Sequence, residues 1–432
     1  MTDLPVVIVG AGVTGLVAAT RLRQAGREVV VLEASETAGG VVRTEHVQGY
    51  IVEHGPQSMR APTADCWRWF EAQELTQHAL PADDLASRRY VLCDGRLEAL
   101  PTRLLGALRS PLIGPRALAR ILLEPLVSRG ANPQESLASF LTRRFGGTVG
   151  GPIADAFTAG IVAGDPTQIE AQSLLPQLTE MESKYGSLLW ASLRAPKRAS
   201  VGQPKVPTTF RGGMQQLTDS LTQNLGDCVR TNHAVQRVRR DGTNTLICEL
   251  EGESIAAAEV IFTVPPAVAS RLWPDAAWWD VPTEPIASVH LGWSARSLES
   301  RRDGFGWLSP RRERPDVLGA IWVSSLFPTH APNGHTLTRL MIGGDRDPSA
   351  VNESDEALIE RAQRVLTEVE GVTEAPTFAH VVRLEAGIPQ YRPGHAGRLQ
   401  ALRASLPDDV QVCGWFYDGV GLSARLQSDV SR

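Results

Sequence analysis

Fully apolar runs alternate with helix-patterned stretches in the N-terminal part of the chain. Residues 6–9 and 29–32 are uninterrupted apolar runs, as in strands that are buried on both faces of a parallel sheet. Residues 16–24 between them are helix-patterned, and Gly26 marks a turn. The pattern predicts a strand, a helix and a second buried strand that ends at Glu33.

Helical periodicity dominates residues 62–200, and strand patterns return after it. The clearest expected helices are 134–145, 153–162, 176–193 and 355–369. The expected strands are 229–231, 234–239, 245–249, 260–264, 287–293, 318–324, 336–342 and a last buried strand at 409–414.

Strand-to-turn units at both ends of the chain enclose different material, which predicts an α/β fold. We expect a Rossmann-like domain assembled from discontinuous segments, a mixed α+β substrate domain and a helical insertion. The expected boundaries are 1–85, 201–266 and 386–432 for the dinucleotide-binding domain, 86–200 for the helical domain and 267–385 for the substrate domain.

A glycine-rich turn follows the first strand and fits the pattern G-x-G-x-x-G. Gly10 permits the tight turn, Gly12 lets the backbone approach a pyrophosphate, and Gly15 lets helix and strand pack closely. The helix N-terminus offers free N–H groups to phosphates, and Glu33 is placed for the ribose hydroxyls. The order of these parts predicts a dinucleotide site; the alternative is a glycine-rich turn that binds nothing.

A second pair of glycines, Gly39 and Gly40, precedes Arg43 and suits a long ligand lying extended across the domain, as FAD does. The chain has no second G-x-G-x-x-G, and its five cysteines form no C-x-x-C. Without a nicotinamide site or a redox dithiol, we expect electrons to leave the flavin to oxygen or a quinone. An oxidase is therefore favoured over a reductase.

Composition narrows the function classes. The net charge of −5 gives no electrostatic case for nucleic acid, and the spacing of the nine histidines predicts no metal site. The first strand begins by Val6, so we expect no signal peptide and a cytoplasmic protein. Residues 104–127 mix apolar and basic side chains, which suits either peripheral membrane contact or ordinary helices over a core.

Residues 39–44 resemble the G-G-x-x-R-T/S segment of the flavin-containing amine oxidase superfamily. Further segments, in order along nearly the whole chain, resemble the oxygen-dependent porphyrinogen oxidases, the protoporphyrinogen IX and coproporphyrinogen III oxidases of haem biosynthesis. These segments are Glu53-His54-Gly55-Pro56 and residues 160–166, 210–214, 262–266, 304–306, 324–328, 388–391 and 417–422.

The resemblance implies where FAD is bound. A helix N-terminus after the 409–414 strand would point its dipole at the flavin N1–C2=O. The resemblance also implies a longer C-terminal helix than this chain supplies after residue 422, and bulky residues 415–417 stand where small ones are common. The expected cofactor residues are Gly10, Ala11, Gly12, Val13, Thr14, Gly15, Glu33, Ala34, Gly39, Gly40, Val41, Arg43, Gly55, Pro56, Gln57, Ser58, Val235, Val420, Gly421 and Leu422.

The resemblance also implies a porphyrinogen pocket. Arg89 would face a propionate, Leu308, Ile321 and Met341 would line the macrocycle, and the Gly160 carbonyl would face the pyrrole N–H groups. From pattern alone, Arg89 reads equally as one solvated arginine beside Arg88, and the three apolar residues read as core.

The implied reaction is a six-electron oxidation of protoporphyrinogen IX by O2 that yields H2O2. No side chain is assigned as a catalytic base, because aromatisation is favourable and orientation is the main requirement. The alternatives are coproporphyrinogen III as substrate, an amine oxidase or carotenoid-type desaturase, and a non-catalytic dinucleotide-fold protein. Enzymes of haem synthesis are candidate partners, and a homodimer is one candidate assembly.

Overall fold

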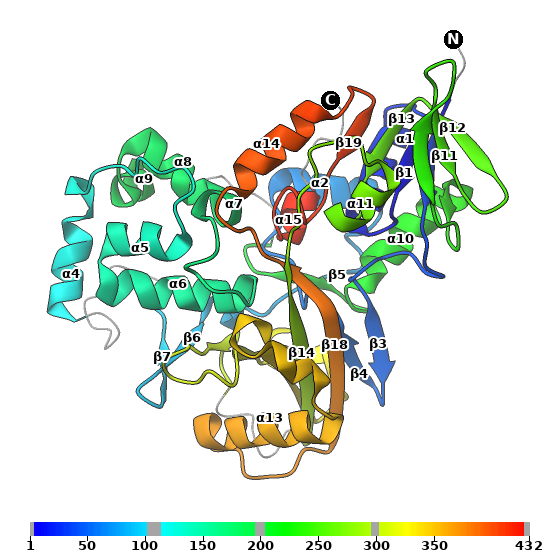
Figure 1. The fold of residues 1–432 in the computed structure, drawn as a ribbon. Helices are drawn as coiled ribbons and strands as arrows, with labels where there is room; N and C mark the ends of the chain where they lie inside the picture. The colour runs from blue at the N-terminus through cyan, green and yellow to red at the C-terminus, as the bar shows by residue number, and fades with distance from the viewer. Residues whose placement is uncertain (1–3, 102–113, 195–203, 295–301, 427–432) are drawn as a thin grey trace.

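The computed structural model describes residues 4–101, 114–194, 204–294 and 302–426. A parallel sheet with its helices, a large mixed sheet and a group of helices make up the molecule (Figure 1). In the view of Figure 1, the helices α4 to α9 lie at the left and strands β14 and β18 run down towards α13 at the bottom. The expected α/β fold is confirmed.

Strands from three distant parts of the sequence form the five-stranded sheet, called the parallel sheet below, in the order β19-β13-β1-β2-β9. Helices α1 (Val13–Gln24), α10 (Gln215–Leu225) and α2 (Ala64–Ala72) pack on it around one apolar core. The Rossmann-like part is therefore assembled from discontinuous segments, as expected. Its strands are β1 (Val6–Val9), β2 (Val29–Leu32), β9 (Val229–Arg230), β13 (Glu259–Phe262) and β19 (Val410–Val412).

The seven-stranded sheet, called the large sheet below, has the order β18-β14-β17-β16-β15-β6-β7. Helix α13 (Asp355–Glu370) packs on one of its faces, against Val289, Leu291 and Leu340. Because side chains alternate along a strand, the even-numbered residues of β14 and the odd-numbered residues of β17 point to the other face. Its strands are β6 (Tyr90–Cys93), β7 (Arg96–Ala99), β14 (Thr283–Ser294), β15 (Gly306–Leu308), β16 (Gly319–Ile321), β17 (His335–Gly343) and β18 (Phe378–Pro389).

The region 86–200, expected to be helical, also supplies β6 and β7 to the large sheet, and two expected elements differ from the structure in type or continuity. The strand expected at 318–324 ends at Ile321, and the chain turns into α12 (Val323–Leu326), where the Ser324 hydroxyl accepts a bond from the Leu337 N–H. The helix expected at 176–193 is broken in two, because Gly186 adopts the left-handed conformation (φ 75°) and ends the first helix. The helical part comprises α4 (Pro115–Leu122), α5 (Leu137–Phe145), α6 (Gly147–Ile161), α7 (Ala171–Leu174), α8 (Pro176–Tyr185) and α9 (Leu188–Arg194).

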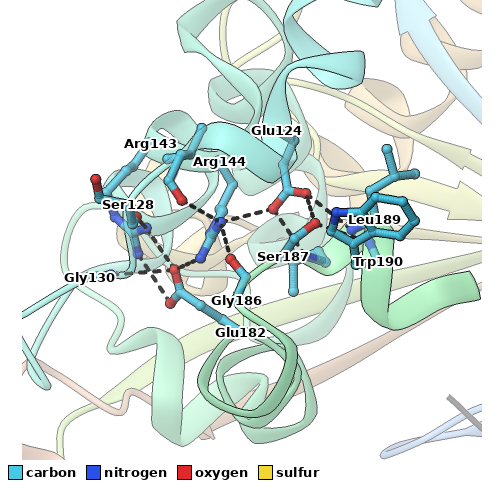
Figure 2. A network of polar contacts seen from close by, with 12 residues as sticks. Glu124, Ser128, Gly130, Arg143, Arg144, Glu182, Gly186, Ser187, Leu189 and Trp190 are labelled. Carbon is cyan, nitrogen blue, oxygen red and sulfur yellow. Dashed lines mark hydrogen bonds and ion pairs between the residues drawn. The ribbon is translucent and has the colours of Figure 1, made fainter. Parts of the chain in front are cut away.

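A buried ion network holds the outer helices together (Figure 2). Arg144 of α5 and Glu124, both fully buried, form an ion pair at 3.0 Å, and Arg144 also pairs with Glu182 of α8. Glu124 accepts bonds from the Leu188 and Leu189 N–H groups at the start of α9, at 3.0 and 3.1 Å. A carboxylate there satisfies helix-terminal donors and favours the positive end of the helix.

Smaller sheets and helices complete the structure. The three-stranded sheet extends the dinucleotide-binding part, and among the described residues no helix is long and apolar enough to cross a membrane. The remaining elements are β3 (Thr44–Val47), β4 (Tyr50–Glu53), β5 (Ala79–Pro81), β8 (Thr208–Phe210), β10 (Arg237–Arg240), β11 (Leu246–Glu249), β12 (Ser254–Ala257), α11 (Pro266–Leu272), α14 (His395–Ser405) and α15 (Leu422–Arg425).

Candidate cofactor and substrate site

The turn between β1 and α1 requires two of its glycines for different reasons. Gly10 has a φ of 104°, a conformation that L side chains rarely adopt. A Cβ atom on Gly15 would lie 2.0 Å from the Gly10 carbonyl oxygen, so only glycine lets α1 pack against the turn. Both positions are constrained by the protein itself.

Among the described residues, no atom stands where a side chain on Gly12 would begin. Its φ of −68° suits any residue, and a Cβ atom there would meet no described heavy atom within 4 Å. The open space lies over the first turn of α1, where the backbone N–H groups of Val13 and Thr14 begin the helix. This free space is the cradle that a pyrophosphate at a helix N-terminus needs.

The second glycine segment lies against the first. The Gly39 N–H donates to the Ala11 carbonyl at 2.8 Å, and a Cβ atom on Gly40 would lie 3.3 Å from the Gly12 Cα. A Cβ atom on Gly55 would lie 2.2 Å from the Val41 carbonyl oxygen. The structure therefore brings three expected cofactor segments into one continuous backbone surface, with the Arg43 side chain exposed nearby.

Glu33 is held in place at the end of β2. Its carboxylate accepts bonds from the Ala11 N–H at 2.8 Å and the Ser35 N–H at 2.9 Å, which leave further lone pairs for hydroxyl groups. The His233 N–H donates to the Glu33 carbonyl at 2.8 Å, so the chain that leads to Val235 passes beside it. Ala34 is exposed and Val235 is half-buried, which leaves apolar surface for an adenine ring.

Gln57 tests whether the residues fit a cofactor. It is buried at 5% exposure, and neither its amide oxygen nor its amide nitrogen has a hydrogen-bond partner among the described residues. Buried amides are almost always paired in native proteins. A polar ligand group beside the Gly55–Pro56 turn would satisfy Gln57, so the cradle and this orphaned amide together fit FAD.

The C-terminal segment reaches the same place. Gly414 has a φ of 127° and a Cβ atom there would approach the Thr14 hydroxyl at 3.6 Å, so the turn after β19 meets the first turn of α1. Val420 packs against the helical part and Leu422 against the dinucleotide core. Within the described residues α15 has four residues, Leu422–Arg425.

Two of the bulky residues of this segment lie in the core of the protein. Phe416 and Tyr417 are buried in the core beside the parallel sheet, and the Tyr417 hydroxyl donates to the Val264 carbonyl at 3.0 Å. The Trp415 carbonyl accepts a bond from the Tyr391 hydroxyl. The Phe416 and Tyr417 side chains therefore anchor the turn.

The expected macrocycle residues meet on one face of the large sheet. Gly319 pairs with both Leu308 and Met341, and Ile321 is two residues further along the same strand. All three apolar side chains therefore point to the face away from α13, and each is only half-buried. A Cβ atom on Gly160 would lie 3.0 Å from Leu308, so the end of α6 adjoins this row.

Arg89 differs from Arg88 beside it. Arg88 forms an ion pair with Asp303, whereas Arg89 has no ion pair with a described residue and lies over the Phe305 ring, 4.9 Å from its centroid. The Arg89 side chain is exposed, yet the surrounding protein and then the charge of Arg60 lower its pKa from the ordinary value.

The sequence pointed to Glu53 only as part of a resembling segment, and it did not single out Arg60 or Arg339. The Arg60 carbonyl accepts a bond from the Ser423 hydroxyl at 3.2 Å, and the charge of Arg60 lowers the pKa of Arg89, so Arg60 lies near both the C-terminal segment and Arg89. Glu53 and Arg339 are buried polar residues between the two sheets. For Arg339, the sequence did hold a signal: it is an arginine within the mainly apolar stretch 337–342, and strands that face a core rarely contain a charged residue.

Comparison with known proteins gives consistent matches over the whole chain. The family model described as flavin containing amine oxidoreductase matches residues 13–414. The chain is 29% identical to protoporphyrinogen oxidase 1 of Spinacia oleracea, covering 98% of this chain and 82% of that protein. It is 25% identical to coproporphyrinogen III oxidase of Bacillus subtilis, covering 96% and 94%.

A solved structure from Exiguobacterium sp. 255-15, named provisionally as a protoporphyrinogen oxidase, superposes with a TM-score of 0.81. It is 25% identical in sequence, and the match covers 99% of this chain and 97% of that one.

Proposed function

Because the chain belongs to the flavin containing amine oxidoreductase family and is an FAD-dependent oxidoreductase, we propose that it oxidises protoporphyrinogen IX to protoporphyrin IX with O2. The observation that carries the proposal is the apolar row of Leu308, Ile321 and Met341 beside Arg89. An apolar row with a cation at its edge suits a macrocycle that carries propionate groups. The names of the related proteins support the same substrate class.

The cofactor would be held mainly by backbone. Gly12 and Gly40 would admit the pyrophosphate, Glu33 would bind the ribose, and Gln57 would pair with a polar group of the flavin or the substrate. Val420, Gly421 and Leu422 would border the isoalloxazine. Bound FAD supplies hydride acceptance at N5 and transfer of the electrons to O2.

The remaining residues bind, orient and exclude water. Leu308, Ile321 and Met341 would pack on the macrocycle, and the Gly160 carbonyl would accept bonds from pyrrole N–H groups. Arg89 would bind one propionate as a charge-assisted pair. Overall the macrocycle loses six hydrogen atoms in three rounds, and three molecules of O2 become three of H2O2, with no side chain required as a strong base.

Coproporphyrinogen III is the second candidate substrate, and Arg60 is the observation that favours it. Arg60 lies close enough to Arg89 for its charge to lower the pKa of Arg89. Neither arginine forms an ion pair with a described residue. Two unpaired cations suit a substrate with more carboxylates, and coproporphyrinogen carries four propionates rather than two. The number of propionates is the difference between the two substrates that these arginines could sense.

The test supplies FAD to the purified protein and then each reduced porphyrinogen separately, and follows porphyrin fluorescence and peroxide against reactions without enzyme. Faster protoporphyrin formation with stoichiometric peroxide supports the proposal. Faster coproporphyrin formation transfers it to the second candidate. An FAD-loaded protein that converts neither substrate would overturn both.

We also propose a cytoplasmic location with peripheral membrane contact through the helical part. Leu126 and Leu193 are 80% and 70% exposed, and Leu122, Leu123 and Trp190 are exposed with them. Glu124 binds the start of α9, so the buried network of Figure 2 connects the segments that carry these side chains. Part of the expected interfacial stretch, residues 102–113, lies outside the described residues.

A further inference from the structure

Arg339 of β17 is a buried arginine that reaches from the large sheet to the cofactor segment. Its side chain is on a residue only 2% exposed, and it donates to the Gly55 carbonyl at 2.9 Å and to the His54 carbonyl at 3.3 Å. It forms no ion pair with a described residue within 4 Å. Burying a guanidinium without a carboxylate partner costs free energy, so the presence of this arginine against two backbone carbonyls requires an explanation.

Glu53 supplies the opposite charge from the same side. It is fully buried at the end of β4 and accepts bonds from the Met214 N–H at 2.7 Å and the Thr44 hydroxyl at 2.8 Å. Thr44 closes the second glycine segment, and a Cβ atom on Gly213 would lie 2.3 Å from the Thr44 methyl group. Glu53 therefore fastens two further segments to the one that Arg339 holds.

The other titratable groups near Arg339 are histidines, and Glu53 is the carboxyl whose charge acts to raise the pKa of Arg339. His290, which pairs with Arg339 across β14 and β17, is fully buried, and burial and then Arg339 hold its pKa well below the ordinary value. His54 and His380 both contact Glu45, His54 at 2.7 Å and His380 at 3.0 Å. Burial raises the pKa of Glu53 to about 7, although Met214, Thr44 and Arg339 each act to lower it.

The position of Arg339 in its strand links cofactor and substrate. Met341 is two residues along β17 on the same face, and Ile321 pairs directly with Arg339. Two of the proposed macrocycle residues therefore lie on the same face of the large sheet as Arg339, one as its cross-strand partner and one two residues along the same strand.

We propose that Arg339 is a positioning residue that fixes the His54 and Gly55 carbonyls, and with them the cofactor, at a set distance from the substrate face of the large sheet. Glu53, which binds the Met214 N–H and the Thr44 hydroxyl beside this segment, is the second buried group that the test addresses. The substrate part of this inference rests on the proposed function, whereas the cofactor part requires only that the protein binds FAD.

The test measures FAD dissociation constants and the melting temperature of the FAD-free protein for Arg339→Met, Arg339→Lys and Arg339→Met with Glu53→Gln. Losing two bonds from a charged donor weakens FAD binding by about tenfold to a hundredfold. Arg339→Lys keeps the charge and restores part of that affinity. The double variant recovers stability, because no unpaired buried charge remains, but does not recover FAD affinity.

Arg361→Met is the control at a buried arginine on the opposite face of the large sheet: Arg361 of α13 also donates to a backbone carbonyl, that of Asp316, but unlike Arg339 it pairs with Asp347 and Glu353 as well. It should lower the melting temperature and leave the FAD dissociation constant unchanged.

Equal FAD affinity in Arg339→Met and wild type would overturn the proposal, as would full recovery of affinity in the double variant. If Arg339→Met does not fold, the same comparison uses Arg339→Lys, and unchanged affinity there contradicts the proposal. FAD affinity is measured without substrate, so this result stands even if the protein converts neither porphyrinogen.

Discussion

The proposed cofactor surface and the proposed substrate face are built from different parts of the polypeptide. The cofactor surface consists of backbone at Gly12, Gly40 and Gly55, and what it needs from these residues is the absence of a side chain. The substrate face consists of side chains on Leu308, Ile321 and Met341, which have the same chemical character as core residues. A backbone site leaves a spaced glycine motif in the sequence, whereas an apolar side-chain site leaves none.

The largest expected effect distinguishes two glycines of one turn. Gly15→Ala places a methyl group against the Gly10 carbonyl and should destabilise the FAD-free protein by about 3 kcal/mol. Gly12→Ala meets only open space, so it should leave that stability unchanged and lower FAD affinity. Urea unfolding and FAD titration of both variants measure these effects. Equal loss of stability in the two variants would mean that Gly12 is a packing residue and not a cofactor residue.

A comparable effect is expected at the junction of the two regions. The pKa of Glu53 is raised from its ordinary value of 4.5 to about 7, so between these pH values the folded protein holds more protons than the unfolded chain. Stability from this group therefore falls as pH rises through that window, by up to about 3 kcal/mol, and is constant above it.

Glu53→Gln removes this titration, so the difference in unfolding free energy between wild type and variant should change between pH 4.5 and pH 8. Urea unfolding at both pH values provides the measurement. A difference that does not change with pH would show that Glu53 does not titrate in this range.

A moderate effect is expected on the substrate face. Arg89→Ala should raise KM about tenfold and change kcat little, because a propionate clamp binds substrate and transition state alike. Arg88→Ala is the control, since Arg88 is paired with Asp303. Steady-state kinetics with each porphyrinogen gives both constants, and unchanged kinetics in Arg89→Ala would remove Arg89 from the site.

The smallest effect on stability is expected at the outer surface of the helical part. Leu126→Ser with Leu193→Ser should change the free energy of unfolding by less than about 0.5 kcal/mol, because both side chains are exposed. Sedimentation with anionic lipid vesicles should nevertheless fall. Vesicle binding equal to that of wild type would assign these leucines no role at a membrane.

The sequence predicted the elements whose pattern is local. The strands β1 and β2, the helix α13 and the strand β19 agree with their apolar runs and periodicity. The elements that were wrong depend on single residues, such as Gly186, which divides the helix expected at 176–193.

Site residues that act through distant partners could not be predicted in the same way. Arg339 is identified by its hydrogen bonds to the carbonyls of residues 54 and 55, and Arg60 is identified by its effect on the pKa of Arg89. Neither pairing leaves a spacing pattern, because the partners come together only when the two sheets pack. The individual cofactor and substrate assignments stay predictions.

A crystal structure of the FAD-loaded protein tests the central claim most directly. The account predicts the pyrophosphate over Gly12 and Gly40, a hydrogen-bonded Gln57 amide, and the isoalloxazine facing the row of Leu308 and Met341. A cofactor that lies away from Gly12, or a flavin ring with its reactive face turned from the large sheet, would contradict it.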